Sequence, residues 1–189
     1  MTFVLPFVVA TIAGMPTLIN RKLVPQTFTG TGDHLVSEAF YFNDPEGNGL
    51  ELYYDRPQTS WQWQDGQIKM DTLYIDPVHY INTHASEKSG AQRKLGHVHL
   101  KIGDIQSAEE FYVKMLGFDV TARVPGALFI SVGGYHHHIG LNTWISKGAA
   151  KRTPTLGLSE VTITLDTSHD VNKLAVRIEA AGLPDCQLV

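Results

Sequence analysis

Between residues 96 and 144 the hydrophobic period of the sequence changes from two to about 3.6 and back to two, which predicts a βαβββ order of elements. His97–Ile102 alternates as a strand does, and apolar residues then recur at helical spacing up to Leu116. Three alternating stretches follow, at 119–124, 127–132 and 137–144. A chain with this pattern folds as a compact module with one helix against a small sheet.

Local signals mark the ends of these elements. Ser107, with Glu110 three residues later, has the form of a capping box. Gly117 stands where a helix C-terminal glycine is expected, and Gly126 and Gly133-Gly134 provide turns.

Two partial copies of the pattern flank this module. Downstream, Val161–Leu165 alternates as a strand, and a helical stripe follows with Asp166, Ser168 and Asp170 as candidate caps. Upstream, residues 39–43 and 50–54 predict strands around the turn-rich segment 44–49. Residues 3–5 predict a buried strand that leads into a short helix.

We therefore expect an α+β fold of βαβββ modules with curled mixed sheets, one whole module and two incomplete ones. The expected division is an incomplete module at 1–56, a linker at 57–94, the whole module at 95–146 and an incomplete module at 147–189. An incomplete sheet exposes unpaired backbone groups along its edge. Either the fragments complete one another or a second chain does, and the second case predicts a homodimer.

Composition excludes several classes of function. The net charge of −4 and the absence of a basic cluster argue against nucleic acid as a partner. Cys186 is a single cysteine and cannot form an internal disulfide, which favours a cytoplasmic protein. The apolar run Thr2–Met15 is shorter than the roughly 20 residues of a membrane span. A signal peptide is the alternative interpretation of that run, although no basic residue precedes it and Pro6 interrupts it.

One segment carries a long pattern of fixed spacing: Gly32-Asp33-His34, five residues, Phe40-Tyr41, two residues, Asp44-Pro45-Glu46-Gly47, three residues and Glu51. It resembles the signature of extradiol ring-cleavage dioxygenases. Gly96-His97-Val98-His99-Leu100, with Phe111-Tyr112 and Leu116-Gly117-Phe118, resembles a module of the vicinal-oxygen-chelate superfamily, to which the catechol-2,3-dioxygenase-like enzymes belong.

The resemblance implies that Glu51 is a carboxylate ligand of Fe(II), with Mn(II) or another divalent metal as alternatives. It implies that His34 is an acid/base beside a bound catecholate and that Tyr41 donates a hydrogen bond to a substrate oxygen. The alternation around Glu51 places its side chain on the face opposite Leu50 and Leu52, where a carboxylate needs a partner. Each of these features also has a purely structural interpretation. The segment 44–49 can be an ordinary hairpin turn, and Glu51 a solvated strand residue. His34 can lie at a loop surface, and Tyr41 can be a core tyrosine with a satisfied hydroxyl.

In the family, two histidine ligands come from the first strands of successive modules. The upstream module that should carry one is absent here, and Thr2 stands at the position of the other. Three explanations are open. The chain is a truncated or rearranged product, disordered segments are missing from the sequence, or other histidines form the metal site. His97, which shares its strand face with His99, is the first candidate for a substitute ligand. The alternative interpretation is that His97 has a structural role and binds no metal.

Other candidate ligands have weaker support from the pattern. His136-His137-His138 cannot all bind one ion if they alternate along a strand, and Glu160 occupies the first-strand position of the last module. Exchange of modules between two chains is a further way to bring Glu51 near His97.

The resemblance thus predicts an Fe(II)-dependent extradiol dioxygenase of aromatic catabolism, which acts on a small aromatic diol and dioxygen and is inactive if its metal site is incomplete. A glyoxalase-type metal-dependent lyase or isomerase is one alternative. A metal-free small-molecule-binding protein of the bleomycin-resistance type is the other.

Overall fold

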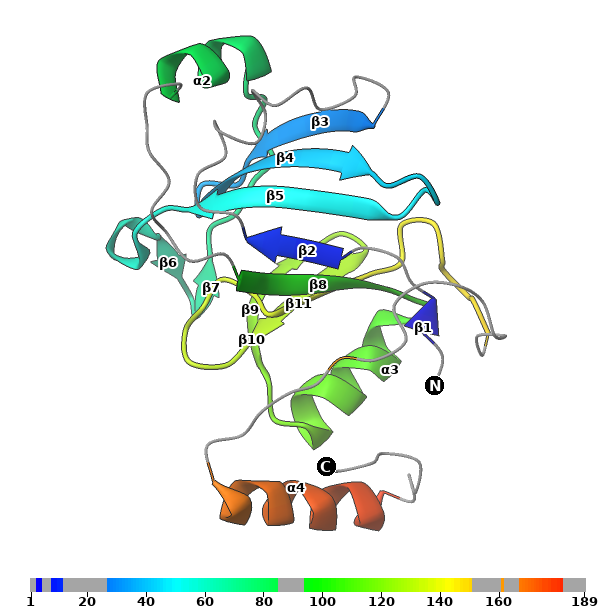
Figure 1. The fold of residues 1–189 in the computed structure, drawn as a ribbon. Coiled ribbons are helices and arrows are strands. Elements are labelled where there is room, and N and C mark those ends of the chain that lie inside the picture. Colours follow the sequence, from blue (N-terminus) through cyan, green and yellow to red (C-terminus); the bar gives the residue numbers. More distant parts are fainter. Residues whose placement is uncertain are drawn as a thin grey trace.

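The computed structural model describes residues 3–4, 8–11, 27–84, 94–150, 161 and 167–181. Its central feature is a nine-stranded mixed sheet with the strand order β3-β4-β5-β2-β8-β11-β10-β9, in which β1 also pairs with β8 (Figure 1). The strands are β1 (Phe3–Val4), β2 (Val8–Thr11), β3 (Phe28–Asp33), β4 (Ser37–Asn43), β5 (Gly49–Asp55), β8 (Lys94–Ile102), β9 (Asp119–Val124), β10 (Ala127–Ser131) and β11 (Ile139–Asn142). The expected α+β class with curled mixed sheets is confirmed.

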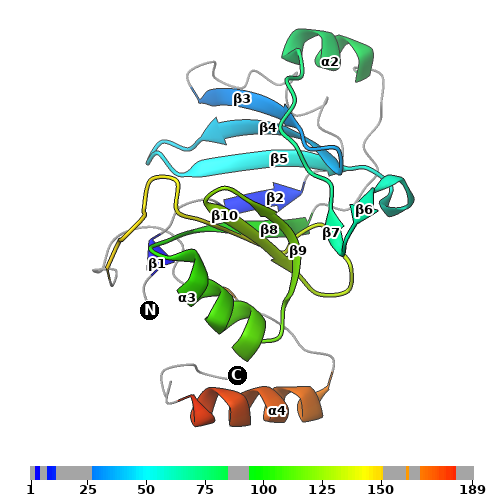
Figure 2. The ribbon, with the colours of Figure 1, turned by 180° about the vertical axis from the view of Figure 1, so that it is seen from behind.

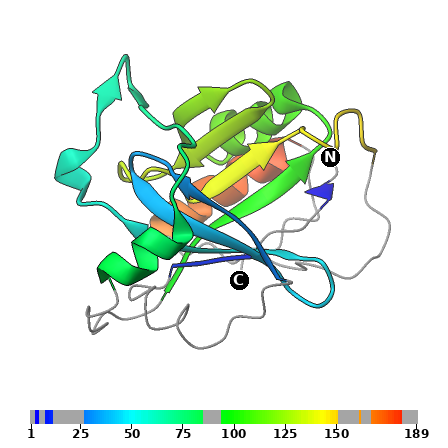
Figure 3. The same cartoon turned by 90° about the horizontal axis from the view of Figure 1, so that it is seen from above.

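The sheet consists of two units that repeat one arrangement. In the downstream unit, β8 is parallel to β11, and β10 and β9 continue antiparallel. In the upstream unit, β2 is parallel to β5, and β4 and β3 continue antiparallel. Antiparallel pairing of β2 with β8 joins the units, and we call this junction the seam. The strands of the upstream unit cross those of the downstream unit when the molecule is seen from above (Figure 3).

The downstream unit is the whole module, with its elements in the expected order. Helix α3 (Ile105–Glu109) continues into the π-helical turn η2 (Glu110–Met115), and Gly117 follows with a positive φ of 89°. The expected Ser107 capping box is wrong, because the helix begins earlier and the Asp104 carboxylate accepts from Ser107 N at 2.7 Å. Beneath the helix lies the largest apolar core, which comprises Val98, Leu100, Ile102, Ala108, Tyr112, Phe118, Leu128, Ile130, Ile139 and Leu141.

The upstream unit has more strands than the sequence predicted. Residues 8–11 form β2 where we expected a short helix, because the β-branched Val8, Val9 and Thr11 favour a strand between β5 and β8. Strand β3 (28–33) was also not predicted, since its glycines and polar residues give little alternation. Residues 12–26, where the rest of that helix would fall, and Thr2 lie outside the described residues.

The segment expected as a linker contains structure of its own. It holds a 3-10 turn η1 (Gln58–Ser60), the hairpin of β6 (Trp63–Gln64) and β7 (Gln67–Ile68), and helix α2 (Pro77–His84). Trp61 and Ile68 pack with Val36 of the upstream unit and Ala122 of the downstream unit. In Figure 2, α2 lies beyond β3, and the hairpin lies beside the sheet. The division into domains stays a prediction.

Helix α4 (Ser168–Ala180) packs outside the downstream unit, where Arg177 donates to the Leu116 carbonyl at 3.4 Å. The Thr167 hydroxyl caps the helix by accepting from Asp170 N, and it donates to the Asp170 carboxylate; the expected cap Asp166 lies outside the described residues. Residues 162–166 of the strand predicted before this helix, and Glu160, lie outside the described residues. Within the described ranges, no helix is long and apolar enough to cross a membrane.

Candidate functional site

Glu51 and His97 meet across the seam of one chain. Glu51 lies on β5 and His97 on β8, and the His97 Nε2 atom is 3.2 Å from Glu51 Oε2. Both side chains are buried, at 5% and 2% exposure. Glu51 points away from the apolar face of Leu50 and Leu52, as its alternation predicted. No exchange of modules between chains is needed to form this pair.

Three histidines form a compact group beside Glu51. One ring nitrogen from each of His97, His99 and His137 lies within 4.8 Å of the others. His97 and His99 share a face of β8, as the sequence predicted. His137 comes from the irregular segment before β11, because the strand predicted from residue 137 begins at Ile139. Within 136–138, only His137 joins the group; His136 bonds Asp55 and His138 bonds Ser131.

Burial keeps two of these imidazoles, those of His99 and His137, in the neutral form that metal binding requires. It lowers the pKa of His99 to about 3 and that of His137 well below its usual value. Burial alone would raise the pKa of Glu51, but the charge of His97 and its hydrogen bond lower that pKa to about 2. A buried carboxylate therefore hydrogen-bonds His97 and lies beside the neutral imidazoles of His99 and His137.

The donor set fits a divalent metal ion. His137 Nε2 is buried and has no hydrogen-bond partner among the described residues, which is costly unless a ligand binds it. Two imidazoles and one carboxylate make the facial triad of non-haem Fe(II) sites, and imidazole also suits zinc, nickel and copper. The three histidines supply imidazoles for such a triad, and Glu51, in contact with His97, is its candidate carboxylate.

His34 and Tyr41 lie next to this cluster. His34 Nδ1 donates to the Asp71 carbonyl at 2.8 Å, and its Nε2 faces the Tyr41 hydroxyl. Tyr41 is the direct partner of Glu51 across β4 and β5. Burial and the Glu51 carboxylate raise the pKa of Tyr41 far above its usual value. Both His34 and Tyr41 are half-buried, which leaves room for a ligand to approach.

Gly32 in the motif makes room for the His34 ring. A Cβ atom at position 32 would lie 2.9 Å from His34 Cε1 and 3.0 Å from Nε2. Gly140 has the same relation to His99, since its Cβ would lie 2.6 Å from His99 Nδ1. These two glycines explain why imidazoles fit on both sides of the seam.

Three functional candidates were not singled out from the sequence: Tyr53, Asp55 and Tyr135. Tyr53 bonds both His97 and Tyr135, and Asp55 bonds both Tyr135 and His136. Tyr53 and Asp55 follow Glu51 at a period of two, so strand alternation could have placed them on its face.

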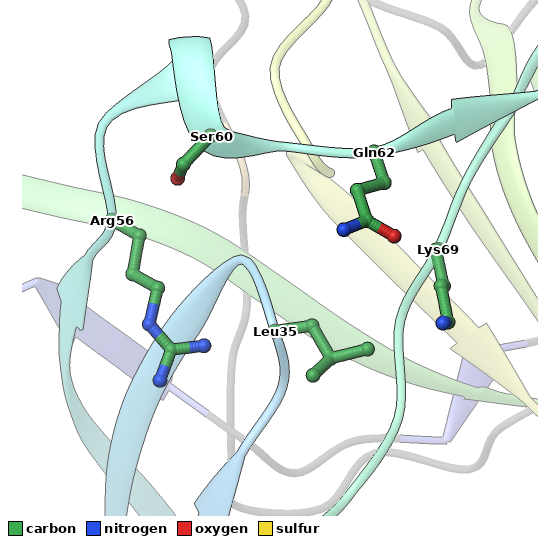
Figure 4. Close-up of a pocket in the computed structure, with 5 residues that line it drawn as sticks. All are labelled: Leu35, Arg56, Ser60, Gln62 and Lys69. Atoms are coloured by element: carbon green, nitrogen blue, oxygen red, sulfur yellow. The ribbon is translucent and has the colours of Figure 1, made fainter.

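A separate pocket of about 280 Å³ opens near the motif (Figure 4). Leu35, Arg56, Ser60, Gln62 and Lys69 line it, and none of the predicted site residues does. Its Arg56 donates to Asp33 and Glu38 at 2.7 and 2.8 Å, so that cation is already paired. We assign the function to the seam and not to this pocket.

Comparison with known proteins supports the class of protein that the fold and site define. Residues 94–185 match the family described as the Glyoxalase/Bleomycin resistance protein/Dioxygenase superfamily. This match covers just under half of the chain. The chain is similar to the "Catechol-2,3-dioxygenase" of Bacillus subtilis (strain 168), with 41% identity over 165 residues. This alignment covers 81% of the chain but 56% of the relative, so the chain spans little more than half the relative's length.

Two solved structures are also similar. A putative dioxygenase from Bacillus subtilis subsp. subtilis str. 168 aligns with 13% identity and a TM-score of 0.43, over 75% of this chain and 42% of that one. A halotolerant catechol dioxygenase called BphC aligns with 17% identity and a TM-score of 0.34, over 93% and 56%.

Proposed function

We propose that this chain carries an extradiol ring-cleavage site for a small aromatic diol, with Fe(II) as its metal. The observation that carries the proposal is the buried contact between Glu51 and His97, which belongs to the group of three imidazoles, with His34 and Tyr41 beside it. Similarity to a catechol-2,3-dioxygenase supports the same class of substrate and dioxygen as co-substrate.

Glu51, His97 and one of His99 and His137 would hold the metal. The bound ion would supply a site at which the diol and dioxygen meet. Around it, burial of Glu51 and His97 excludes water and keeps the carboxylate next to the imidazoles. Mn(II) or another divalent metal is the alternative occupant.

His34 and Tyr41 would handle the substrate's protons. The Asp71 carbonyl fixes the His34 ring with Nε2 toward the Tyr41 hydroxyl, so His34 can accept a proton there and return it. Tyr41 would direct its hydroxyl at a substrate oxygen. A short, fixed distance between these groups is what acid–base catalysis requires.

Oxygen uptake by the anaerobically Fe(II)-loaded chain, with catechol as substrate, tests the proposal. We expect stoichiometric oxygen consumption and formation of the ring-opened product. Glu51→Gln should lose bound iron and both signals while its circular dichroism spectrum stays unchanged. Unchanged metal content in Glu51→Gln would refute the ligand role. Absence of ring opening by the iron-loaded wild type would refute the reaction.

The group of three histidines also favours a second function. Because imidazole suits metals without redox chemistry, a glyoxalase-type lyase or isomerase remains compatible with the site. Bound metal without oxygen uptake would favour this alternative, and failure to bind metal would favour a metal-free binding protein. A homodimer and a cytoplasmic location also stay proposals. Pairing of β2 with both β5 and β8 joins the two units within one chain, and β3 and β9 are the outer strands of the described sheet.

A further inference from the structure

Asp55, at the end of β5, uses both carboxylate oxygens to bond side chains from the segment before β11. His136 Nε2 lies 2.9 Å from Oδ1, and the Tyr135 hydroxyl donates to Oδ2 at 2.8 Å. An ionised carboxylate only accepts hydrogen bonds. Each oxygen is therefore the end of a chain of hydrogen bonds whose direction is fixed.

The first chain leads to His97. Tyr135 gives its only hydroxyl hydrogen to Asp55, so the Tyr53 hydroxyl, 2.8 Å away, must donate to Tyr135. Tyr53 has then used its own hydrogen. It can only accept from His97 Nδ1 at 3.0 Å. His97 therefore carries a proton on Nδ1, and its Nε2 is the nitrogen that faces Glu51.

The second chain leads to His137. His136 Nε2 donates to Asp55. A proton on His137 Nε2 would be a buried donor without a partner among the described residues, so the Nδ1 atom of His136 is the acceptor between the two rings. His137 Nδ1 lies 2.7 Å from that atom and must donate to it. The remaining nitrogen, His137 Nε2, has no proton. It is also the buried atom that has no hydrogen-bond partner among the described residues.

We propose that Asp55 is a positioning residue that fixes the Nδ1 proton of both His97 and His137, so that the Nε2 atom of each is the one turned toward the metal site. The proposal rests on the metal site of the proposed function. Histidine ligands usually donate their other N–H to a fixed acceptor, which sets the ring orientation. Here one carboxylate serves two imidazoles, through two tyrosines on one side and a third histidine on the other.

Asp55→Asn tests the direction of these chains. The asparagine side chain offers one acceptor and one donor group, so it can satisfy one chain and must reverse the other. We expect one of the two histidines to lose its Nδ1 proton and gain it on Nε2. Two-bond ¹H–¹⁵N correlation spectra of the metal-free, ¹⁵N-histidine-labelled protein measure this directly. In the wild type, both Nδ1 atoms should be protonated.

Two further variants separate this role from a merely structural one. Asp33→Asn makes the same change at a carboxylate of similar exposure, 23% against 24% for Asp55, that bonds none of these histidines. It should leave all tautomers unchanged. Tyr135→Phe removes only the first chain, so His97 should lose the fixed Nδ1 proton while His137 keeps its own.

Metal affinity gives a second readout. Cobalt(II) titration should show binding about 10–100-fold weaker in Asp55→Asn, the usual effect of losing an outer partner of a metal ligand. An Nε2 proton on His137 in the wild type, or unchanged tautomers in both Asp55→Asn and Tyr135→Phe, would overturn the proposal. The tautomers are measured without metal, so they decide it even if the iron-loaded protein fails to open catechol.

Discussion

The two units of the sheet share a strand order but bury different kinds of residue. The downstream unit encloses a continuous apolar core under α3, in which Leu128, Ile130 and Leu141 are completely buried. The upstream unit has a smaller apolar face, where Phe40 and Phe42 pack with Tyr80 of α2. Its other face carries polar groups toward the seam.

The difference teaches where the chemistry comes from. The upstream unit supplies Glu51, Asp55 and the pair His34–Tyr41, whereas the downstream unit supplies the imidazoles. Neither unit has a complete donor set, so the site depends on the seam. We expect substitutions in the upstream unit to change the reaction more than stability and those in the downstream core to do the opposite.

The largest effect is expected for His34→Ala, which removes the proposed acid/base. Turnover of catechol by the iron-loaded protein should fall about 10²–10⁴-fold, the usual contribution of such a group, while bound iron stays the same. Steady-state oxygen uptake and metal analysis measure both quantities. His79→Ala, at an exposed position on α2, is the control. Loss of iron or full activity in His34→Ala would show that the role is wrong.

The next effect concerns the downstream core. Leu128→Ala should lower the free energy of unfolding by about 2–5 kcal/mol, because it leaves a cavity at a completely buried position. Leu52→Ala, at a half-buried position of the upstream unit, should cost less. Urea unfolding measures the free energy of unfolding of both variants. A larger loss in Leu52→Ala than in Leu128→Ala would contradict the prediction.

A smaller effect is expected when an alanine replaces the glycine that makes room for an imidazole. Gly140→Ala should displace His99 and lower metal affinity, at an overpacking cost of about 1–3 kcal/mol. Gly32→Ala should displace His34 instead, which slows turnover and leaves metal affinity unchanged. Metal titration and oxygen-uptake measurements on both variants distinguish the two effects. Equal loss of metal affinity in both variants would contradict the assignment of His34 to the substrate's protons and not to the metal.

The smallest effect is expected at the Asp33–Arg56 pair of the upstream unit. Hydrogen bonds from Arg56 lower the pKa of Asp33 despite partial burial. The pair therefore stabilises the protein above the unfolded pKa of about 3.9 and loses this contribution as the pH falls through the folded value. Asp33→Asn should cost about 1 kcal/mol at pH 7. The difference in the free energy of unfolding between the wild type and Asp33→Asn should shrink at acid pH. Urea unfolding at several pH values measures it, and a difference that stays constant would contradict the prediction.

Sequence alone predicted the parts of the molecule that depend on local periodicity. The strands and helix of the downstream unit follow from alternation and helical spacing, and so does the face of Glu51. The pairing of β2 between β5 and β8 depends on residues far apart in the sequence, so no local pattern indicated it. For the same reason, the sequence did not indicate that His137 joins His97 and His99, or that Asp55 bonds His136.

The position of β2 in the middle of the sheet also has a consequence for folding. Residues 8–11 pair with 50–53 on one side and with residues between 94 and 98 on the other. This strand can take its place only after distant parts of the chain have met, and such non-local pairing slows folding. Once β2 is in place, the two units share backbone hydrogen bonds and cannot separate as independent bodies. We therefore expect both units to unfold together in a single cooperative transition.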